Sequence, residues 1–595
     1  MRNYSIKSVI TLVLTVLFIN VSFSQTQSAV KKENLKVLFV GGTSEISAYA
    51  QSKPAPEVIE ASVQKRMKAF ETLLKTYFTE VTVIRAKEFR EELSDNFDVT
   101  IIDGMPPERV PLYTEKDEKG NYTVYKNAGF LSEEFDNPTL MIADIPDRIG
   151  RRIGLKLDWY CLCLDAHAYN IDKSHSIFKG PFKVSLTMEE LPTPKDALSF
   201  QKYYKDIIPA TQQMWRVQTQ GYMTTPDFRV GMVCRPWGFT DSPDTEVISG
   251  GVSLKSPDAI AIGRHGNFFH WGFAASPDYM TEEAKVVFAN AVHYTSKLKG
   301  EKVIARKYDD RKSTRNEMFF VYSRSPKDSA VMSTNLPYLY MDKGSRSGLK
   351  IDEDAKLVGV ATNNHLILDR AITMLEKGES TDVSQRILDR YTLVTFCSPK
   401  GYRDWYEKYK QDLFFTESGG FYFLVNPKSK PNTTAGKSNT TAGESNPIYG
   451  NDYSLMLIER AARGVKVGET DNLNPVNAAV TLVRLDNGEI AVVARVKIEK
   501  GFHIYAKVSE REPYIETVAD FVAPEGYKPY GERNTPASIK YGENGTFIYE
   551  GDFIFYQKFL GKGPGQFKFN FAYQCCDDQI CMPPVEREFL TGTLL

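Results

Sequence analysis

The sequence predicts a multi-domain protein with an N-terminal α/β domain, a mainly helical middle region and a C-terminal all-β sandwich. Three observations predict this order. Short apolar runs alternate with helical patterns over residues 35–300, short amphipathic helices mark residues 301–465, and strand patterns without a long helix fill residues 475–595. The length of 595 residues suits three or four domains of ordinary size.

The first 24 residues have the pattern of a secretory signal peptide. Arg2 and Lys7 precede an apolar run over residues 9–21, and Ser22-Phe-Ser24 supplies small residues for cleavage. The run is shorter than the ~20 residues of a membrane span, and no later stretch is long and apolar enough. We therefore expect an exported, periplasmic protein that does not span the membrane.

The charge of the chain is balanced. With 74 basic and 75 acidic residues, the formal net charge is −1. A nucleic-acid-binding protein normally carries a basic surface, so this balance argues against nucleic acid as a partner.

Within residues 35–300, apolar runs and helical patterns predict a mostly parallel, doubly wound sheet. The expected strands are 36–40, which ends at Gly41-Gly42, then 81–85, 99–103, 140–143 and 155–164, with a late hairpin over 259–263 and 267–272. The expected helices span about 56–77 and 282–297, and Thr281 is suited to cap the second one.

The middle region has a different pattern. Residues 366–375 and 384–391 predict short amphipathic helices, and the spacing of Trp405, Tyr409 and Leu413 indicates one face of a further helix. The repeated Asn-Thr-Thr-Ala-Gly segments near residues 430–446 are polar and low in complexity, which is typical of an exposed insert or linker.

The C-terminal region predicts an antiparallel, immunoglobulin-like sandwich of about 120 residues. Residues 480–485 and 490–498 flank Asp486-Asn-Gly488, which is a hairpin signal. Phe567, Phe569, Phe571 and Tyr573 alternate with polar or small residues, so one face of that strand is aromatic and buried.

Three of the seven cysteines cluster near the C-terminus, in Tyr573-Gln-Cys-Cys-Asp-Asp-Gln-Ile-Cys-Met-Pro-Pro584. Extending the aromatic alternation places Cys575 on the buried face, where a thiol is inert, and turns Cys576 to the other face. Four residues separate Cys576 from Cys581, and Asp577 favours a turn that would allow the two to bridge. The aspartates beside them would raise a thiol pKa, which suits a site that waits for an attacking thiolate.

This segment resembles the N-terminal periplasmic domain of the thiol:disulfide interchange protein DsbD. The shared pattern is Tyr-Gln-x-Cys-(x4)-Cys-x-Pro-Pro, with similar segments at Gly501–Tyr505 and Tyr549–Gly551. The resemblance implies that Cys576 and Cys581 are a redox pair that exchanges electrons with a thioredoxin-like reductase and oxidised client proteins. In that family an aromatic cap shields the pair, and Tyr541 is the candidate for it here.

The alternation and the resemblance together predict a Cys576–Cys581 bond and a free Cys575. The same spacing also fits a permanent disulfide that pins a hairpin, in a binding or scaffold protein. A zinc site is not expected, because His503 is the sole histidine near the three cysteines. We expect no cofactor.

The N-terminal domain resembles the ThuA-like branch of the class I glutamine amidotransferase-like fold, which implies a flavodoxin-like sheet. The resemblance rests on Gly41-Gly42, Ser174–Gly180 and Gly266–Gly272. Amidotransferases carry their cysteine on a glycine-flanked elbow, whereas Cys161 and Cys163 lie in Tyr-Cys-Leu-Cys-Leu-Asp without glycine. We therefore expect two buried strand cysteines and no amidotransferase activity.

Four residues are candidates for ligand binding in this domain: His167, His265, His270 and Trp271. If they meet at the strand ends, they could hold a carbohydrate or peptide, because aromatic faces stack on such ligands. The alternative is that they are structural groups. The leading hypothesis is thus an exported thiol–disulfide interchange protein with a non-catalytic α/β domain for a ligand or client.

Overall fold

The structure is a computed structural model. It describes residues 30–593 except 158, 200, 202–205, 235–237, 253–257, 307–314, 316–329, 332, 342–348, 397, 428–452, 486–488, 510–511, 543–544 and 578–579. The predicted signal peptide, the low-complexity insert and the Asp486–Gly488 turn lie outside the described residues.

The N-terminal domain is built on a mixed sheet, twelve-stranded over the described residues, in the order β2-β1-β3-β6-β14-β13-β12-β8-β10-β9, with β11 and β7 off this path. The strands are β1 Glu33–Gly41, β2 Phe78–Arg85, β3 Val99–Ile102, β6 Thr139–Ile142, β7 Trp159–Leu164, β8 His167–Tyr169, β9 Met188–Pro192, β10 Thr211–Arg216, β11 Gly231–Cys234, β12 Thr245–Gly251, β13 Ile260–His265 and β14 Phe268–Trp271. A separate hairpin pairs β4 Tyr113–Lys116 with β5 Tyr122–Lys126.

The prediction of a mostly parallel sheet is right for only one half of it. Strands β2, β1, β3, β6 and β14 run parallel, whereas β13, β12, β8, β10 and β9 pair antiparallel. A parallel neighbour needs a long crossover. Between β7 and β14 the described residues contain only one short α-helix, α3 Lys195–Leu198, and the 3-10 turn Ser176–Phe178, so most strands there return antiparallel.

Helices cover both faces of the parallel half, as expected for a doubly wound sheet. On one face α1 (Pro56–Tyr77) and α4 (Glu282–Ser296) pack together, and the Phe70 ring lies 4.8 Å from Phe39 and 5.6 Å from Phe288. On the other face α2 (Ile145–Ile153) joins a second apolar cluster. The predicted cap of α4 is confirmed, because Thr281 Oγ1 accepts from Ala284 N at 3.2 Å.

The middle region packs short helices against two hairpins around a common apolar core. Its elements are α7 Glu353–Val358, α8 Leu366–Lys377, α9 Thr381–Tyr391 and α10 Pro399–Tyr409, with strands β15 Leu339–Met341, β16 Leu349–Ile351, β17 Leu413–Thr416 and β18 Tyr422–Val425. The expected helices near 366–375 and 384–391 are present. Leu413 does not continue the helix of Trp405, because α10 ends at Tyr409 and Leu413 begins β17.

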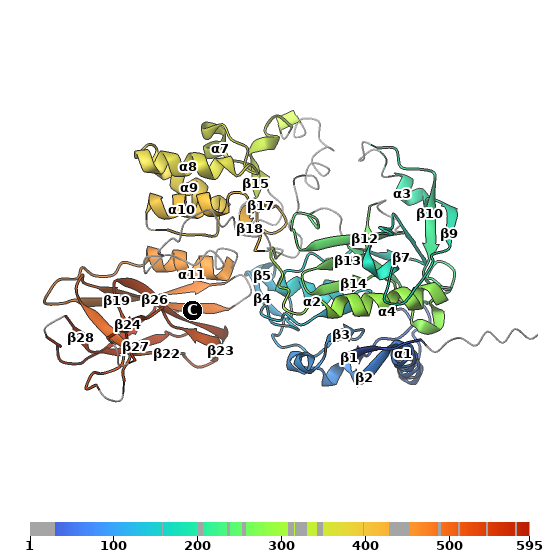
Figure 1. The fold of residues 1–595 in the computed structure, drawn as a ribbon, viewed down its shortest axis with the longest axis horizontal. Helices are drawn as coiled ribbons and strands as arrows, with labels where there is room; N and C mark the ends of the chain where they lie inside the picture. Colours follow the sequence, from blue (N-terminus) through green and yellow to red (C-terminus); the bar gives the residue numbers. More distant parts are fainter. Residues whose placement is uncertain are drawn as a thin grey trace, which may run out of the picture.

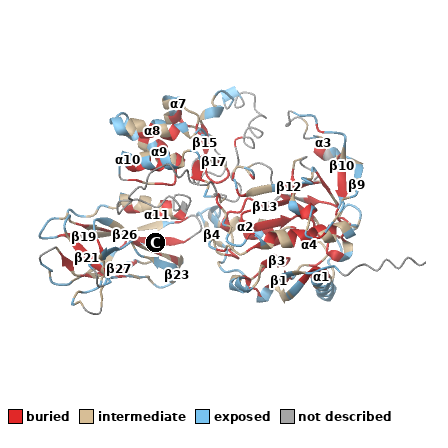
Figure 2. Ribbon diagram, in the orientation of Figure 1, coloured by how far each residue is buried: buried red, intermediate tan, exposed pale blue. Residues whose placement is uncertain are grey.

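The C-terminal domain contains layered antiparallel sheets that resemble a β-sandwich. One sheet has the order β19-β20-β26-β23, another β24-β25-β21-β28, and a third β22-β27-β29. The strands are β19 Val476–Arg484, β20 Ile490–Ile498, β21 His503–Lys507, β22 Val518–Val522, β23 Tyr527–Asn534, β24 Ile539–Tyr541, β25 Thr546–Tyr549, β26 Asp552–Gly561, β27 Lys568–Tyr573, β28 Cys575–Cys576 and β29 Val585–Leu590. Their inward faces enclose an aromatic core (Figure 2).

Figure 1 shows the α/β domain and the sandwich side by side, with the helices α7–α10 above the sandwich and α11 (Tyr453–Gly464) lying on it. A buried lysine anchors the middle region to the first domain: Lys156 Nζ donates to Ser418 Oγ at 2.8 Å and pairs with Asp241. The sandwich meets the first domain at the β26 end, where Lys562 lies over the Tyr113 ring at 5.6 Å. Strand β28 lies at the opposite end of the sandwich.

Among the described residues, no helix combines the length and apolar character needed to cross a membrane.

Candidate functional site

The two adjacent cysteines of β28 face opposite sides of their sheet. Phe569, Phe571 and Tyr573 of β27 point into the sandwich core, and Cys575 continues that face as a buried free thiol. Cys576 turns the other way and is also buried, in a separate small apolar cluster. The predicted face assignment is therefore confirmed, and its cause is the two-residue period of a strand.

Cys576 forms a disulfide with Cys581, as expected. Asp577 N donates to Ile580 O at 3.0 Å, and Ile580 N donates to Asp577 Oδ1 at 2.7 Å, so the predicted turn brings the chain back. Cys576 is 1% exposed, whereas Cys581 is exposed. One sulfur of the bond is thus shielded and the other lies at the surface.

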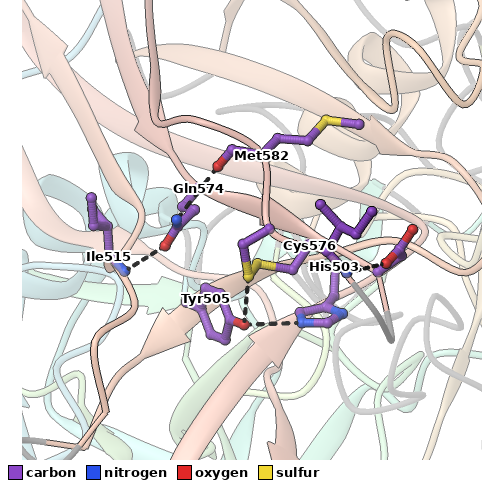
Figure 3. The surroundings of a disulfide bond; sticks show 9 residues. His503, Tyr505, Ile515, Gln574, Cys576 and Met582 are labelled. Atoms are coloured by element: carbon purple, nitrogen blue, oxygen red, sulfur yellow. Dashed lines mark hydrogen bonds between the residues drawn. A yellow bond between two sulfur atoms is a disulfide. The ribbon is translucent and has the colours of Figure 1, made fainter.

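Strand β21 carries the residues that surround the bond. Its His503 and Ile504 pair with Cys576 and Cys575, and the alternation of β21 then directs Tyr505 to the same side as His503. The Tyr505 hydroxyl donates toward Cys581 Sγ at 3.9 Å, and His503 Nε2 lies 3.4 Å from that hydroxyl (Figure 3). From the sequence, His503 was weighed only as a zinc ligand and Tyr505 was not singled out, although both stand in the Gly501–Tyr505 segment that carried the resemblance.

Aromatic rings complete the shell. Tyr505 stacks on Tyr514 with centroids 4.4 Å apart and an interplanar angle of 8°. Tyr541, the predicted cap, lies at the end of β24 with its ring 4.8 Å from His503 and 6.3 Å from Tyr505. Tyr541 and Tyr514 are both partly buried against the cluster that contains Cys576. Tyr541 therefore belongs to a tyrosine cluster at the disulfide, and its role as a cap stays a prediction.

Burial favours the protonated forms of the Tyr505 hydroxyl and the Cys575 thiol. Burial, followed by the neighbouring Tyr514 and Tyr541, raises the pKa of Tyr505, so its hydroxyl remains a donor at neutral pH. Burial, with a smaller contribution from Asp577, raises the pKa of the Cys575 thiol to about 12. Because the thiolate is the reactive form, Cys575 is inert.

A glutamine holds the disulfide loop against the neighbouring loop. Gln574 Oε1 accepts from Ile515 N at 3.1 Å, and Gln574 Nε2 donates to Met582 O at 3.4 Å. These bonds connect the chain after Cys581 with the loop that carries Tyr514. The side chains of Ile515 and Ile580 are 44% and 68% exposed, so both loops present apolar surface.

The candidate residues of the N-terminal domain are not gathered at one strand edge. His265 and Trp271 are completely buried on β13 and β14, and His270 is buried with Nε2 3.2 Å from Met232 O. Since β13 runs antiparallel to β14, it ends with His265 at the edge where β14 begins, away from the carboxyl ends of the parallel strands. His167 lies half-buried on β8, away from the β13–β14 hairpin.

The junction between β6 and α2 has the shape on which elbow nucleophiles sit, but it carries an alanine. Ala143 follows β6 with φ of 53°, a left-handed conformation that is uncommon for a residue with a side chain. Its methyl group offers no nucleophile. Cys163 is buried and disulfide-bonded, and Cys234 is buried, while the Cys161 side chain and Cys397 lie outside the described residues. In the described part of the chain, no group of histidine, cysteine and carboxylate side chains could hold a metal ion.

Comparison with known families decides the nature of the C-terminal domain. Residues 470–593 match the family model for the N-terminal domain of the thiol:disulfide interchange protein DsbD. The predicted resemblance to that family is therefore confirmed for the C-terminal domain, the DsbD-like domain, which carries Cys576 and Cys581. The resemblance of the N-terminal domain to the ThuA-like fold stays a prediction.

Solved structures similar to the chain include two from Neisseria meningitidis: the DsbD N-terminal domain in reduced form (20% identity, 19% of this chain and 85% of that one, TM-score 0.14), and the complex of the DsbD and PilB N-terminal domains (19% identity, 20% and 87%, TM-score 0.14). The N-terminal periplasmic domain of ScsB from Proteus mirabilis also matches, at 12% identity and TM-score 0.16. The match covers 20% of this chain and about half of that one (48%). No curated protein matches.

Proposed function

We propose that the protein is an exported thiol–disulfide interchange protein that passes electrons through Cys576 and Cys581. The observation that carries this proposal is the asymmetry of the disulfide, with Cys581 at the surface and Cys576 buried beneath tyrosines. An attacking thiolate needs access to one sulfur only. A bond with one exposed sulfur meets this need, and a fully buried staple would not.

The exposure of Cys581 determines which of the two sulfur atoms is attacked. A thiolate of the reductase attacks Cys581 Sγ, the Cys576–Cys581 bond breaks, and Cys576 leaves as a thiolate that takes up a proton. A second thiol of the reductase then attacks its own sulfur in the mixed disulfide and releases Cys581. Two electrons and two protons have moved to the pair, and the reductase has become a disulfide.

The same surface serves the second half of the cycle. The Cys581 thiolate attacks one sulfur of an oxidised client, and the Cys576 thiolate resolves the mixed disulfide, so the client is reduced and the Cys576–Cys581 bond returns. Tyr505 is placed to donate to the Cys581 sulfur when it carries charge. A thioredoxin-like reductase docking at the Cys581 loop, rather than over Cys576, fits this geometry.

The α/β domain has no catalytic part in this proposal. Its elbow-shaped junction carries Ala143, and its histidines are buried or dispersed. Its place is to bind a ligand or client beside the redox domain, in the periplasm to which the predicted signal peptide directs the chain.

Trapping distinguishes exchange from a structural bond. Incubated with a reduced thioredoxin-like domain, the wild-type disulfide should open within minutes. Incubated instead with an oxidised client, Cys576→Ser keeps the exposed Cys581 thiol, which attacks the client disulfide and should accumulate a mixed disulfide because the resolving Cys576 is missing, whereas Cys581→Ser should accumulate few. A bond that resists the partner, yet whose loss lowers the melting temperature by many degrees, would identify a structural staple and refute the proposal.

A further inference from the structure

A cavity of about 320 Å³ lies in the middle region, far along the chain from the cysteines. It opens where β15, α9 and the turn before β18 meet α11. Its volume is at the lower end of the roughly 300–1,000 Å³ of small-molecule sites, which suits a ligand with a single ring.

The floor of the cavity is apolar and its rim is cationic. Tyr340, Met341 and Phe421 form the floor, and each is at least nine-tenths buried. The rim holds the guanidinium groups of Arg386, Arg390 and Arg460. Asp389 is the one carboxylate among the described residues that line the cavity.

Arg460 donates to the backbone oxygen of Asp389 and lies 3.8 Å from its carboxylate. The other two rim arginines are held from outside the cavity. Asp354 binds Arg386 through Nε at 3.0 Å and Nη2 at 2.8 Å, a fork that does not use Nη1. Asp352 accepts from Arg390 Nη1 at 2.6 Å. Neither aspartate lines the cavity. The charges are therefore positioned before a ligand arrives, which lowers the entropy cost of binding.

Two further contacts involve the rim arginines. The Arg390 guanidinium lies 4.6 Å from the centroid of the Tyr340 ring, which fixes its plane at the cavity wall. The hydrogen-bonded Asp354 raises the pKa of Arg386, while the like charge of Arg390 lowers it. Asp354 also lies 3.5 Å from Arg390 Nη1, so it pairs with both arginines from behind, and an oxyanion in the cavity would face both guanidinium groups from the other side.

We propose that this cavity binds a small organic anion, with its carboxylate or phosphate at the arginine rim and its flat apolar body on the Met341 and Phe421 floor. Guanidinium groups match the planar geometry of such oxyanions and bind them bidentately. A neutral ligand of the same shape would lack the charge-assisted hydrogen bonds that an oxyanion accepts from guanidinium groups.

The occupant would also contact two parts of the protein at once. Arg460 belongs to α11, and α11 packs onto the sandwich through Ile458 and Ala462. A ligand that contacts both α9 and α11 therefore stabilises the position of α11 on the DsbD-like domain. Binding here does not depend on the redox proposal.

The test uses the full-length protein and isothermal titration calorimetry with benzoate, phenyl phosphate and the neutral benzamide. One or both anions should bind, and benzamide should not. Arg386→Gln should weaken anion binding by about tenfold or more, since a charged hydrogen bond is removed. Asp389→Asn should strengthen it, because the one acidic lining group becomes neutral.

Arg403→Gln is the matched control. Arg403 lies on α10 and forms the same kind of fork with Glu376, at 3.0 and 2.9 Å, outside the cavity. Arg386 is half-exposed, so the loss of its ion pair should leave the fold intact. Absence of binding by both anions up to about 10 mM, equal binding of benzamide, or equal losses in Arg386→Gln and Arg403→Gln would overturn the proposal.

Discussion

Cys575 and Cys576 are neighbours in the chain and belong to different chemical environments, because the backbone of β28 turns them to opposite faces. Cys575 packs into the aromatic core of the sandwich, and Cys576 bonds to Cys581 beneath Tyr505. A one-residue shift of β28 against β21 would exchange the two thiols. The register therefore decides which cysteine can react.

The first prediction concerns Cys575. Its raised pKa of about 12 and its burial predict that it resists alkylation in the native protein at neutral pH, even after the disulfide is reduced. Mass mapping of alkylated peptides should show Cys581 modified first. Cys575→Ala should leave exchange unchanged and cost about 1 kcal/mol of stability from the small cavity. Fast alkylation of Cys575 would contradict the face assignment.

Tyr541 provides a test of the cap. Tyr541→Ala opens one side of the cluster around Cys576, so reduction of the disulfide by dithiothreitol should become several-fold faster. Tyr527→Ala is the control, because Tyr527 packs on Phe567 with centroids 5.1 Å apart, outside the cluster at the disulfide. Equal rates in wild type and Tyr541→Ala would show that the ring does not shield the bond.

The hydroxyl of Tyr505 can be removed without its ring. Tyr505→Phe keeps the stack on Tyr514 and deletes the donor that lies 3.9 Å from Cys581 Sγ. Since a hydrogen bond to a thiolate favours the charged form, the pKa of Cys581 in the reduced protein should rise. Thiolate absorbance followed against pH measures this change, with the free energy of unfolding altered by about 1 kcal/mol or less. An unchanged pKa would assign Tyr505 a packing role only.

Buried charge in the N-terminal domain predicts a large effect on stability. Arg66 is completely buried and binds Asp103 with Nε at 2.7 Å and Nη2 at 2.8 Å. Arg66→Met leaves that carboxylate with fewer partners, so unfolding should become easier by about 3–5 kcal/mol. Arg85→Gln breaks a partly exposed pair with Glu60 and should cost about 1 kcal/mol or less. Denaturant titration of both variants checks the contrast.

His270 predicts acid sensitivity. Burial lowers its pKa to about 4, while the unfolded value is near 6.5. The unfolded chain therefore binds the proton first, and stability is full above pH 6.5 and falls as the pH drops toward 4, by about 3 kcal/mol from this group. His270→Gln cannot take up the proton, so its melting temperature should depend less on pH over that window. If the melting temperatures of the wild type and His270→Gln changed with pH in the same way, His270 would not be the source of the acid sensitivity.

The sequence by itself determined the local elements and the pairing at the disulfide. Alternation of Phe569, Phe571 and Tyr573 follows from the two-residue period of a strand, so it predicted the opposite faces of Cys575 and Cys576. Helical sequence patterns likewise predicted α1 and α4, and the Thr281 cap followed from its side chain. These features depend on neighbours within a few residues, which a sequence displays directly.

Only the tertiary structure decided what depends on distant residues. The half-antiparallel sheet and the end at which His265 lies follow from how β13 pairs with β14, which no local pattern encodes. Tyr505 and Tyr514 meet Cys576 because separate segments of the sandwich pack at one end. The arginine rim joins Arg386 with Arg460, seventy-four positions apart in the sequence. Residues so far apart come together only when the core closes around them, because burial of apolar surface, rather than sequence proximity, places them.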